Sequence, residues 1–169
     1  MQNIEIKVRV PALNPVRELA VALGAEPLWN HDQTDTYFNV SHGRLKLRET
    51  SDDASGTLIS YARPDETESR ISQYRLLPVS EPETLKRMLG ETLGVLVTVE
   101  KRRELLIYCS TRIHLDEVNG LGTFVELETV IADQSPDEAW QEHQFVREQL
   151  GLGSHEPVPV SYSDLMLEK

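Results

Sequence analysis

Lysine, arginine and glutamate recur at every second position of several segments whose intervening residues are apolar. Glu5, Lys7 and Arg9 alternate with isoleucine and valine, and Lys46 and Arg48 alternate with leucine. Because successive side chains of a β-strand point to opposite faces, each segment would carry one ionisable face as a strand. Basic groups of this kind bind phosphoryl oxygens, and clustered carboxylates hold Mg²⁺ or Mn²⁺.

The signs of these charges are sorted along the chain. Carboxylates occur in the first and last of the segments, whereas the middle segments are basic. In a closed barrel the acidic group would be Glu5, Glu126 and Glu128, and the basic group Lys7, Lys46, Arg48, Arg63, Arg70, Lys101 and Arg103. Buried charges need partners, so such an interior would have to be hydrated and filled by a polyanion with metal ions. A triphosphate is a ligand of that kind.

An ordinary half-exposed sheet is the simpler interpretation, with the charged face in solvent. For any single strand that interpretation is favoured. Thr and Ser also serve a solvent face, however, and here the charged types recur at alternate positions in strand after strand. The recurrence favours an inward-facing charged surface.

Period-two alternation predicts about eight strands, and short connections between them favour antiparallel hairpins. The predicted strands are 4–10, 37–40, 44–49, 57–63, 70–77, 97–107, 111–118 and 123–130. Three helix starts are predicted from capping signals, namely Asn14 with Pro15, Ser80 with Glu83, and Ser135 with Glu138. The chain is therefore expected to form one α+β domain over residues 1–169, with an antiparallel sheet as its main element.

Composition excludes several classes of function. The formal net charge of −11 repels nucleic-acid backbones, so no nucleic-acid partner is expected. No apolar run approaches the roughly 20 residues of a membrane span, no leader segment is recognisable, and the single cysteine suits a reducing compartment. We therefore expect a cytoplasmic protein without a membrane partner, either a monomer or a homodimer.

Seven short motifs follow one another in the order found in a known family. They are residues 3–7, 33–38, 45–49, 61–65, 101–103, 113–128 without the turn, and 161–165. Together these motifs resemble the CYTH family, also called triphosphate tunnel metalloenzymes, which includes class IV adenylate cyclases and thiamine triphosphatases. The resemblance implies an eight-stranded antiparallel closed β-barrel, the triphosphate tunnel, with helices packed outside.

The resemblance also implies roles for individual residues. The implied metal ligands for Mg²⁺ or Mn²⁺ are Glu5, Glu126 and Glu128. The implied phosphate ligands are Lys7, Lys46, Arg48, Arg63, Lys101 and Arg103, with Arg9 and Arg70 also facing the tunnel and binding substrate. Glu5, Lys7 and Arg63 are the expected catalytic residues. The family opens on Glu-x-Glu-x-Lys, and Asn3 stands at the first glutamate, which favours one metal over two.

Three functions remain open from the sequence. The leading one is metal-dependent hydrolysis of a triphosphate, whether nucleoside, organic or inorganic. The alternatives are class IV cyclisation of ATP to cyclic AMP and pyrophosphate, and non-catalytic binding of a nucleotide or polyphosphate. The chain lacks the His-Phe pair expected ahead of the opening motif in cyclases, which disfavours cyclisation. We interpret the five histidines as structural or surface residues, and Trp29 as a packing anchor or a residue at the tunnel mouth. Asp116 either shapes the hairpin beside Gly120 or supports residues of the site, and the structural role is favoured.

Overall fold

The computed structural model describes residues 2–62, 68–132 and 134–169. Its long strands are β1 (Gln2–Arg9), β2 (Glu26–Phe38), β3 (Arg44–Thr50), β4 (Asp53–Ala62), β5 (Arg70–Val79), β6 (Val95–Tyr108), β7 (Thr111–Val118) and β8 (Gly122–Val130). The helices are α1 (Asn14–Leu23), α2 (Pro82–Leu93), α3 (Pro136–Gln149) and α4 (Tyr162–Leu167), with a short 3₁₀ turn at Leu152–Ser154 and a two-residue strand β9 (Glu156–Pro157). The predicted α+β class is confirmed.

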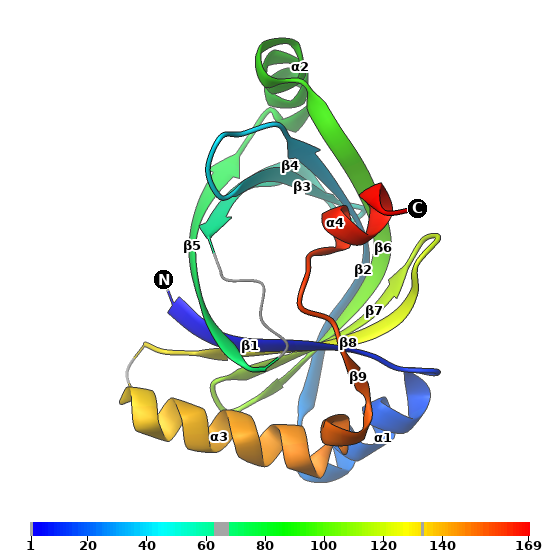
Figure 1. Ribbon diagram of the computed structural model, residues 1–169, viewed down its shortest axis with the longest axis vertical. Coiled ribbons are helices and arrows are strands. Elements are labelled where there is room, and N and C mark those ends of the chain that lie inside the picture. The colour runs from blue at the N-terminus through cyan, green and yellow to red at the C-terminus, as the bar shows by residue number, and fades with distance from the viewer. Residues whose placement is uncertain (1, 63–67, 133) are drawn as a thin grey trace.

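The eight long strands close into an antiparallel barrel. The strand order is β5-β4-β3-β2-β6-β7-β8-β1, and β1 pairs with β5 to complete the circle. Figure 1 shows the strands surrounding a central space, with the helices outside. Closure turns one face of every strand inward, which decides where the alternating charges lie.

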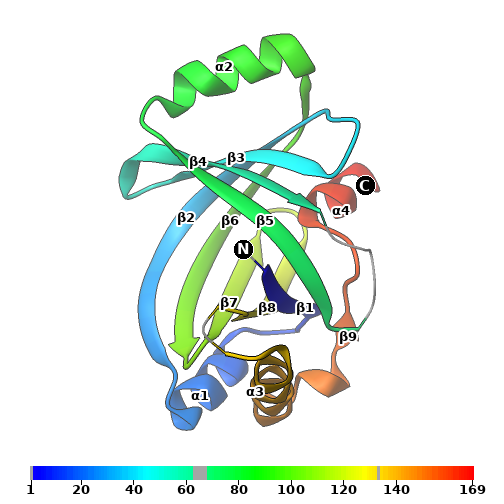
Figure 2. The same cartoon turned by 90° about the vertical axis from the view of Figure 1, so that its left-hand side faces the viewer.

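The main hydrophobic core lies outside the barrel. Apolar side chains from the outer faces of β1, β6, β7 and β8 pack with residues of α1 and α3, among them Ile6, Leu106, Ile113, Val125 and Val146. Figure 2 shows α1 and α3 at one end of the molecule and α2 at the other. The alternation of apolar and charged residues therefore resolves into an apolar outer face and a charged inner face.

Helix α2 contributes little to this packing. It has no buried residue, and it contacts β2, β3 and β4. The predicted capping box at its start is wrong, because Glu81 is the N-cap residue without a side-chain cap, and Glu83 pairs instead with Lys86 at 2.8 Å. The box of Ser135 and Glu138 on α3 is confirmed.

Two further predictions need correction. Asn14 is the first residue of α1 and not its cap, and its side-chain amide donates to Glu18 at 2.8 Å. Strand β2 begins at Glu26, eleven residues before the predicted start, and pairs with β6 over almost its whole length. This extension adds Leu28 and Trp29 to the residues that face the interior of the barrel. No helix in the described ranges is long and apolar enough to cross a membrane.

Candidate functional site

The inward faces of the strands line a cavity of about 480 Å³. Eight of the charged residues predicted from the alternating pattern line it, namely Glu5, Lys7, Lys46, Arg48, Lys101, Arg103, Glu126 and Glu128. They come from β1, β3, β6 and β8, which are far apart in sequence. The predicted convergence of charged faces on one interior space is therefore confirmed for these residues.

One side of the cavity, which we call the basic wall, consists of Lys46, Arg48 and Lys101. All three side chains bind the same carboxylate, that of Asp35 on β2. The Nζ atoms of Lys46 and Lys101 lie 2.8 and 2.7 Å from Asp35 Oδ2, and Arg48 donates through Nε and Nη2, each at 2.8 Å. Three cations on one carboxylate leave an excess of two positive charges on this wall.

The facing side, which we call the acidic wall, consists of Glu5, Glu126 and Glu128 on β1 and β8. In the β1–β8 register, Glu5 lies opposite Glu128, and Lys7 lies opposite Glu126. Like charges placed opposite each other on neighbouring strands destabilise a sheet. A cation between these strands would remove that repulsion.

Each glutamate of the acidic wall lies near a basic side chain. Arg70 Nε is 3.4 Å from Glu5 Oε1, and Arg103 Nη2 is 2.8 Å from Glu126 Oε2. His114 Nε2 is 3.4 Å from Glu128 Oε2. Burial alone would raise the pKa of the Glu128 carboxyl, but the charge of His114 opposes it and lowers that pKa to about 2. Each carboxylate of the acidic wall is thus paired within the protein, whereas the basic wall keeps its positive excess.

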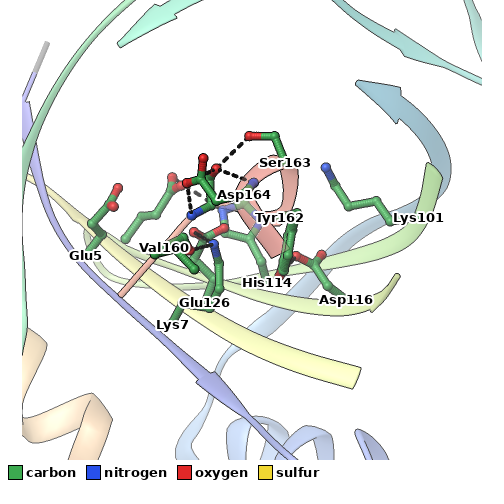
Figure 3. A network of polar contacts seen from close by, with 12 residues as sticks. Glu5, Lys7, Lys101, His114, Asp116, Glu126, Val160, Tyr162, Ser163 and Asp164 are labelled. Carbon is green, nitrogen blue, oxygen red and sulfur yellow. Dashed lines mark hydrogen bonds and ion pairs between the residues drawn. The ribbon is translucent and has the colours of Figure 1, made fainter. Parts of the chain in front are cut away.

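Helix α4 brings an aromatic side chain against these charges at one end of the cavity. Lys7 Nζ lies 4.1 Å from the centre of the Tyr162 ring, and the Tyr162 hydroxyl donates to Asp116 at 2.6 Å. Asp116 also accepts two bonds from Arg103, each at 2.6 Å. Figure 3 shows Lys7, Glu126 and Tyr162 grouped together, with Glu5 and Lys101 on either side of them. The C-terminal segment therefore forms part of the site.

Within the described residues, two predicted site residues, Arg9 and Arg70, do not line the cavity. Arg9 donates to the carbonyl of Leu121 at 2.7 Å and stacks on Phe124, with its guanidinium carbon 4.6 Å from the ring centre. Arg70 is 3% exposed and lies beside Glu5 in the wall. Arg63 lies outside the described residues, so its predicted role in binding and catalysis stays a prediction.

Part of the cavity is apolar. Leu28 and Trp29 on β2 and Leu105 and Ile107 on β6 line it together with the charged residues. The ring of Trp29 stacks on that of His31, with centroids 4.5 Å apart and planes 14° apart. Trp29 was predicted to be either a packing anchor or a residue at the tunnel mouth. Because its side chain lines the cavity, the structure favours the second alternative.

The residue types on the acidic wall fit a hard divalent cation, which takes oxygen ligands. The side-chain oxygen of Asn3 is buried, its residue lines the cavity, and no hydrogen-bond partner for that oxygen is found in the described ranges. Within those same ranges, no three carboxylate, imidazole or thiol groups already converge on one point. A cation would therefore have to draw the glutamates away from their basic neighbours.

The sequence interpretation missed Asp35, and it assigned His114 and Asp116 to structural or surface roles. Asp35 and Asp116 are fully buried and hold the cations, while His114 lines the cavity beside Glu128. Asp35 alternates with Gln33 and Tyr37, but this stretch has no apolar alternation to reveal a strand. The regular alternation of residues 111–118 did reveal β7, and its inward positions include His114 and Asp116.

Comparisons with known proteins agree with this geometry. The sequence model of the CYTH domain matches residues 1–162. A Methanocaldococcus jannaschii protein provisionally named as an adenylate cyclase is 25% identical over 175 residues, covering 98% of each chain. A solved structure from Pyrococcus horikoshii aligns with a TM-score of 0.86 at 23% identity, covering 96% of this chain and 98% of that one.

A plant structure is also similar. A Hippeastrum protein, provisionally named as an adenylyl cyclase and reported to have a dominant triphosphatase activity, aligns with a TM-score of 0.67 at 19% identity. The alignment covers 98% of this chain and 95% of that one. At this identity the likeness supports the shared barrel fold.

Proposed function

The chain belongs to the CYTH family, and from that premise we propose that it hydrolyses a triphosphate with the help of Mg²⁺ or Mn²⁺. One observation carries the proposal, namely that a basic wall and an acidic wall line the same cavity of about 480 Å³. A polyanion alone would need only the basic wall. A second wall of carboxylates is useful when a metal ion accompanies the polyanion.

The basic wall supplies the binding groups for phosphoryl oxygens. Arg48 offers a planar guanidinium donor, and Lys46 and Lys101 offer ammonium groups; Arg103, which lines the same cavity outside this wall, adds a second guanidinium. These groups are held in place by buried carboxylates before any ligand arrives. Preorganised donors of this kind stabilise charge that develops on phosphorus, which is the main requirement of phosphoryl transfer.

Glu5, Glu126 and Glu128 would hold the metal, with the side-chain oxygen of Asn3 as a further neutral donor. When bound, a divalent cation neutralises charge on the phosphoryl oxygens and polarises them. Lys7 lies on β1 within the acidic wall, with its Nζ 3.6 Å from Glu126 Oε1, and is therefore well placed to contact a terminal phosphoryl oxygen there. Tyr162 lines the cavity beside Lys7, with its ring centre 4.1 Å from Lys7 Nζ.

A second candidate is cyclisation of ATP, which requires a seat for the adenine base. The apolar part of the cavity around Trp29, Leu105 and Ile107 favours a substrate with an organic group. The M. jannaschii relative carries a cyclase name, whereas the Hippeastrum protein is reported to act mainly as a triphosphatase. Both reactions would use the same two walls.

Identification of the products tests the proposal. The purified chain is incubated with tripolyphosphate, ATP or thiamine triphosphate, with Mg²⁺, with Mn²⁺ or with excess EDTA. Release of orthophosphate that EDTA abolishes is the expected result. Cyclic AMP with pyrophosphate would instead establish cyclisation, and tight binding without either product would establish a non-catalytic binder.

A further inference from the structure

Asp35 is the only carboxylate of the described residues that hydrogen-bonds all three cations of the basic wall. Its side chain is fully buried. The strand register explains the arrangement. Asp35 lies opposite Arg48 of β3, while Lys46 and Lys101 lie opposite the alternate neighbours Tyr37 and Gln33. Directly opposite and diagonal neighbours across a sheet are within reach of long side chains.

Asp35 stands behind the basic wall and not on its surface. Lys46, Arg48 and Lys101 line the cavity, whereas Asp35 is not among the described residues that do so. A ligand in the cavity would meet the cations without meeting Asp35. The carboxylate therefore does not occupy the space of a phosphoryl group, which distinguishes it from a competing anion.

Asp35 also stabilises the charged form of the side chains that it orients. The three cations hold the pKa of Asp35 well below its ordinary value although burial opposes this, so the group stays a carboxylate. Burial lowers the pKa of the Lys101 ammonium well below its ordinary value, and the negative charge of Asp35 counteracts that loss. Without Asp35, Lys101 would both lose its orientation and release its proton more easily.

We propose that Asp35 is a positioning residue that aims Lys46, Arg48 and Lys101 into the cavity and thereby sets the affinity for the triphosphate. This inference rests on the proposed triphosphate site. Asp35 remains behind the wall and does not contact the substrate. Loss of a group that orients direct ligands typically weakens the site by about 10- to 100-fold.

The test is calorimetric titration of the full chain with tripolyphosphate in excess EDTA, which measures binding without metal and without turnover. Asp35→Asn keeps the shape of the side chain and removes its charge, and we expect its dissociation constant to rise by about 10- to 100-fold. Asp32→Asn is the matched control, because Asp32 is exposed on the same strand and loses the same charge. That control should bind like the parent.

A second ligand separates positioning from general damage. Mn²⁺ titrated alone reports on the acidic wall, and Asp35→Asn should retain the parent's Mn²⁺ affinity. Equal losses of Mn²⁺ and tripolyphosphate affinity would mean that the barrel had loosened, which would overturn the proposal. Unchanged or tighter tripolyphosphate binding would also overturn it, because Asp35 would then be neutral or a competitor.

Asp35→Glu carries the test if the asparagine variant does not fold. It retains the negative charge but adds a methylene at a fully buried position, which shifts the carboxylate. Positioning predicts about tenfold weaker tripolyphosphate binding in this variant, whereas parental affinity would contradict it. If the parent neither binds tripolyphosphate nor releases orthophosphate from it with Mg²⁺ or Mn²⁺, the proposed function is wrong and the role of Asp35 in it falls as a consequence.

Discussion

The two walls of the tunnel satisfy their buried charges in different ways. On the basic wall one buried carboxylate, Asp35, holds three cations at hydrogen-bonding distance. On the acidic wall the glutamates lie near different basic groups, most of them at longer distances. Glu5 is 3.4 Å from Arg70, Glu126 is 2.8 Å from Arg103 and 3.6 Å from Lys7, and Glu128 is 3.4 Å from His114 and 3.7 Å from Arg112. We therefore expect the bonds between Asp35 and the basic wall to persist when a ligand binds. The glutamates of the acidic wall should instead exchange their basic partners for a cation.

This contrast explains how a charged interior is tolerated without a ligand. Burying an unpaired charge costs several kcal/mol, so every charge in the tunnel needs a partner before substrate arrives. Rigid pairing on one wall fixes the phosphate-binding donors, and loose pairing on the other leaves ligands that a metal can recruit.

The largest effect is expected on the acidic wall. Glu126→Gln removes a charge that a metal would need, and we expect metal-dependent turnover to fall by more than about 100-fold, since even groups outside the metal's own ligands cost 10- to 100-fold. Folding should persist, because Arg103 keeps its two bonds to Asp116. Steady-state phosphate release and thermal unfolding measure the two effects.

Glu117→Gln is the control for that experiment, because Glu117 is exposed on the neighbouring strand β7. It should leave turnover unchanged. Undiminished activity in Glu126→Gln would show that the metal assignment is wrong.

The pH dependence of stability isolates the pairing of Glu128. Its folded pKa of about 2 lies below the ordinary value of 4.5, so the unfolded chain takes up a proton first as the pH falls. In metal-free buffer, the stabilisation from the Glu128 charge should be lost as the pH falls from about 4.5 to about 2.

Urea unfolding of the parent and of Glu128→Gln over this pH range measures that contribution as a difference. A difference that did not change with pH would exclude the ion pair with His114 as its source.

On the basic wall, rigidity depends on the two-pronged bond between Arg48 and Asp35. Arg48→Lys retains the charge but replaces two donors by one, so we expect about tenfold weaker tripolyphosphate binding. Arg102→Lys is the matched control on an exposed side chain of β6. If both variants bound tripolyphosphate with equal affinity, the charge at position 48 would suffice for binding and the two-pronged geometry would not matter.

The smallest effect is expected at the apolar part of the cavity, which belongs to neither wall. Trp29→Ala should raise KM for ATP or thiamine triphosphate by about fivefold through lost ring contacts and leave KM for tripolyphosphate unchanged. Trp140→Ala, on α3 outside the barrel, is the comparison. A similar change in KM for all three substrates would show that the apolar region does not recognise the organic group of the substrate.

Much of this arrangement could be predicted from the sequence, because period-two alternation fixes which side chains share a face. The alternation of Glu5, Lys7 and their apolar neighbours gave both the strand and its charged side. It failed over residues 30–36 of β2, where polar residues fill both faces and no pattern distinguishes a strand from a loop. Asp35 was missed for that reason.

Partner choice within the tunnel could not be predicted either. Alternation places Arg70 and Arg103 on inward faces, but only the register of paired strands puts Arg70 beside Glu5 and Arg103 beside Asp116. The contribution of Tyr162 depends on how the C-terminal segment returns across the barrel, which no local pattern specifies. Long-range pairing is therefore the physical information that the sequence interpretation lacked.

The most direct test of the account is a crystal structure of the chain with tripolyphosphate and Mn²⁺, recorded with the anomalous signal of manganese. We predict the polyphosphate in contact with Lys46, Arg48 and Lys101, and manganese bound by at least one glutamate of the acidic wall. Polyphosphate or manganese bound only outside the barrel, with the tunnel pairs undisturbed, would contradict the account.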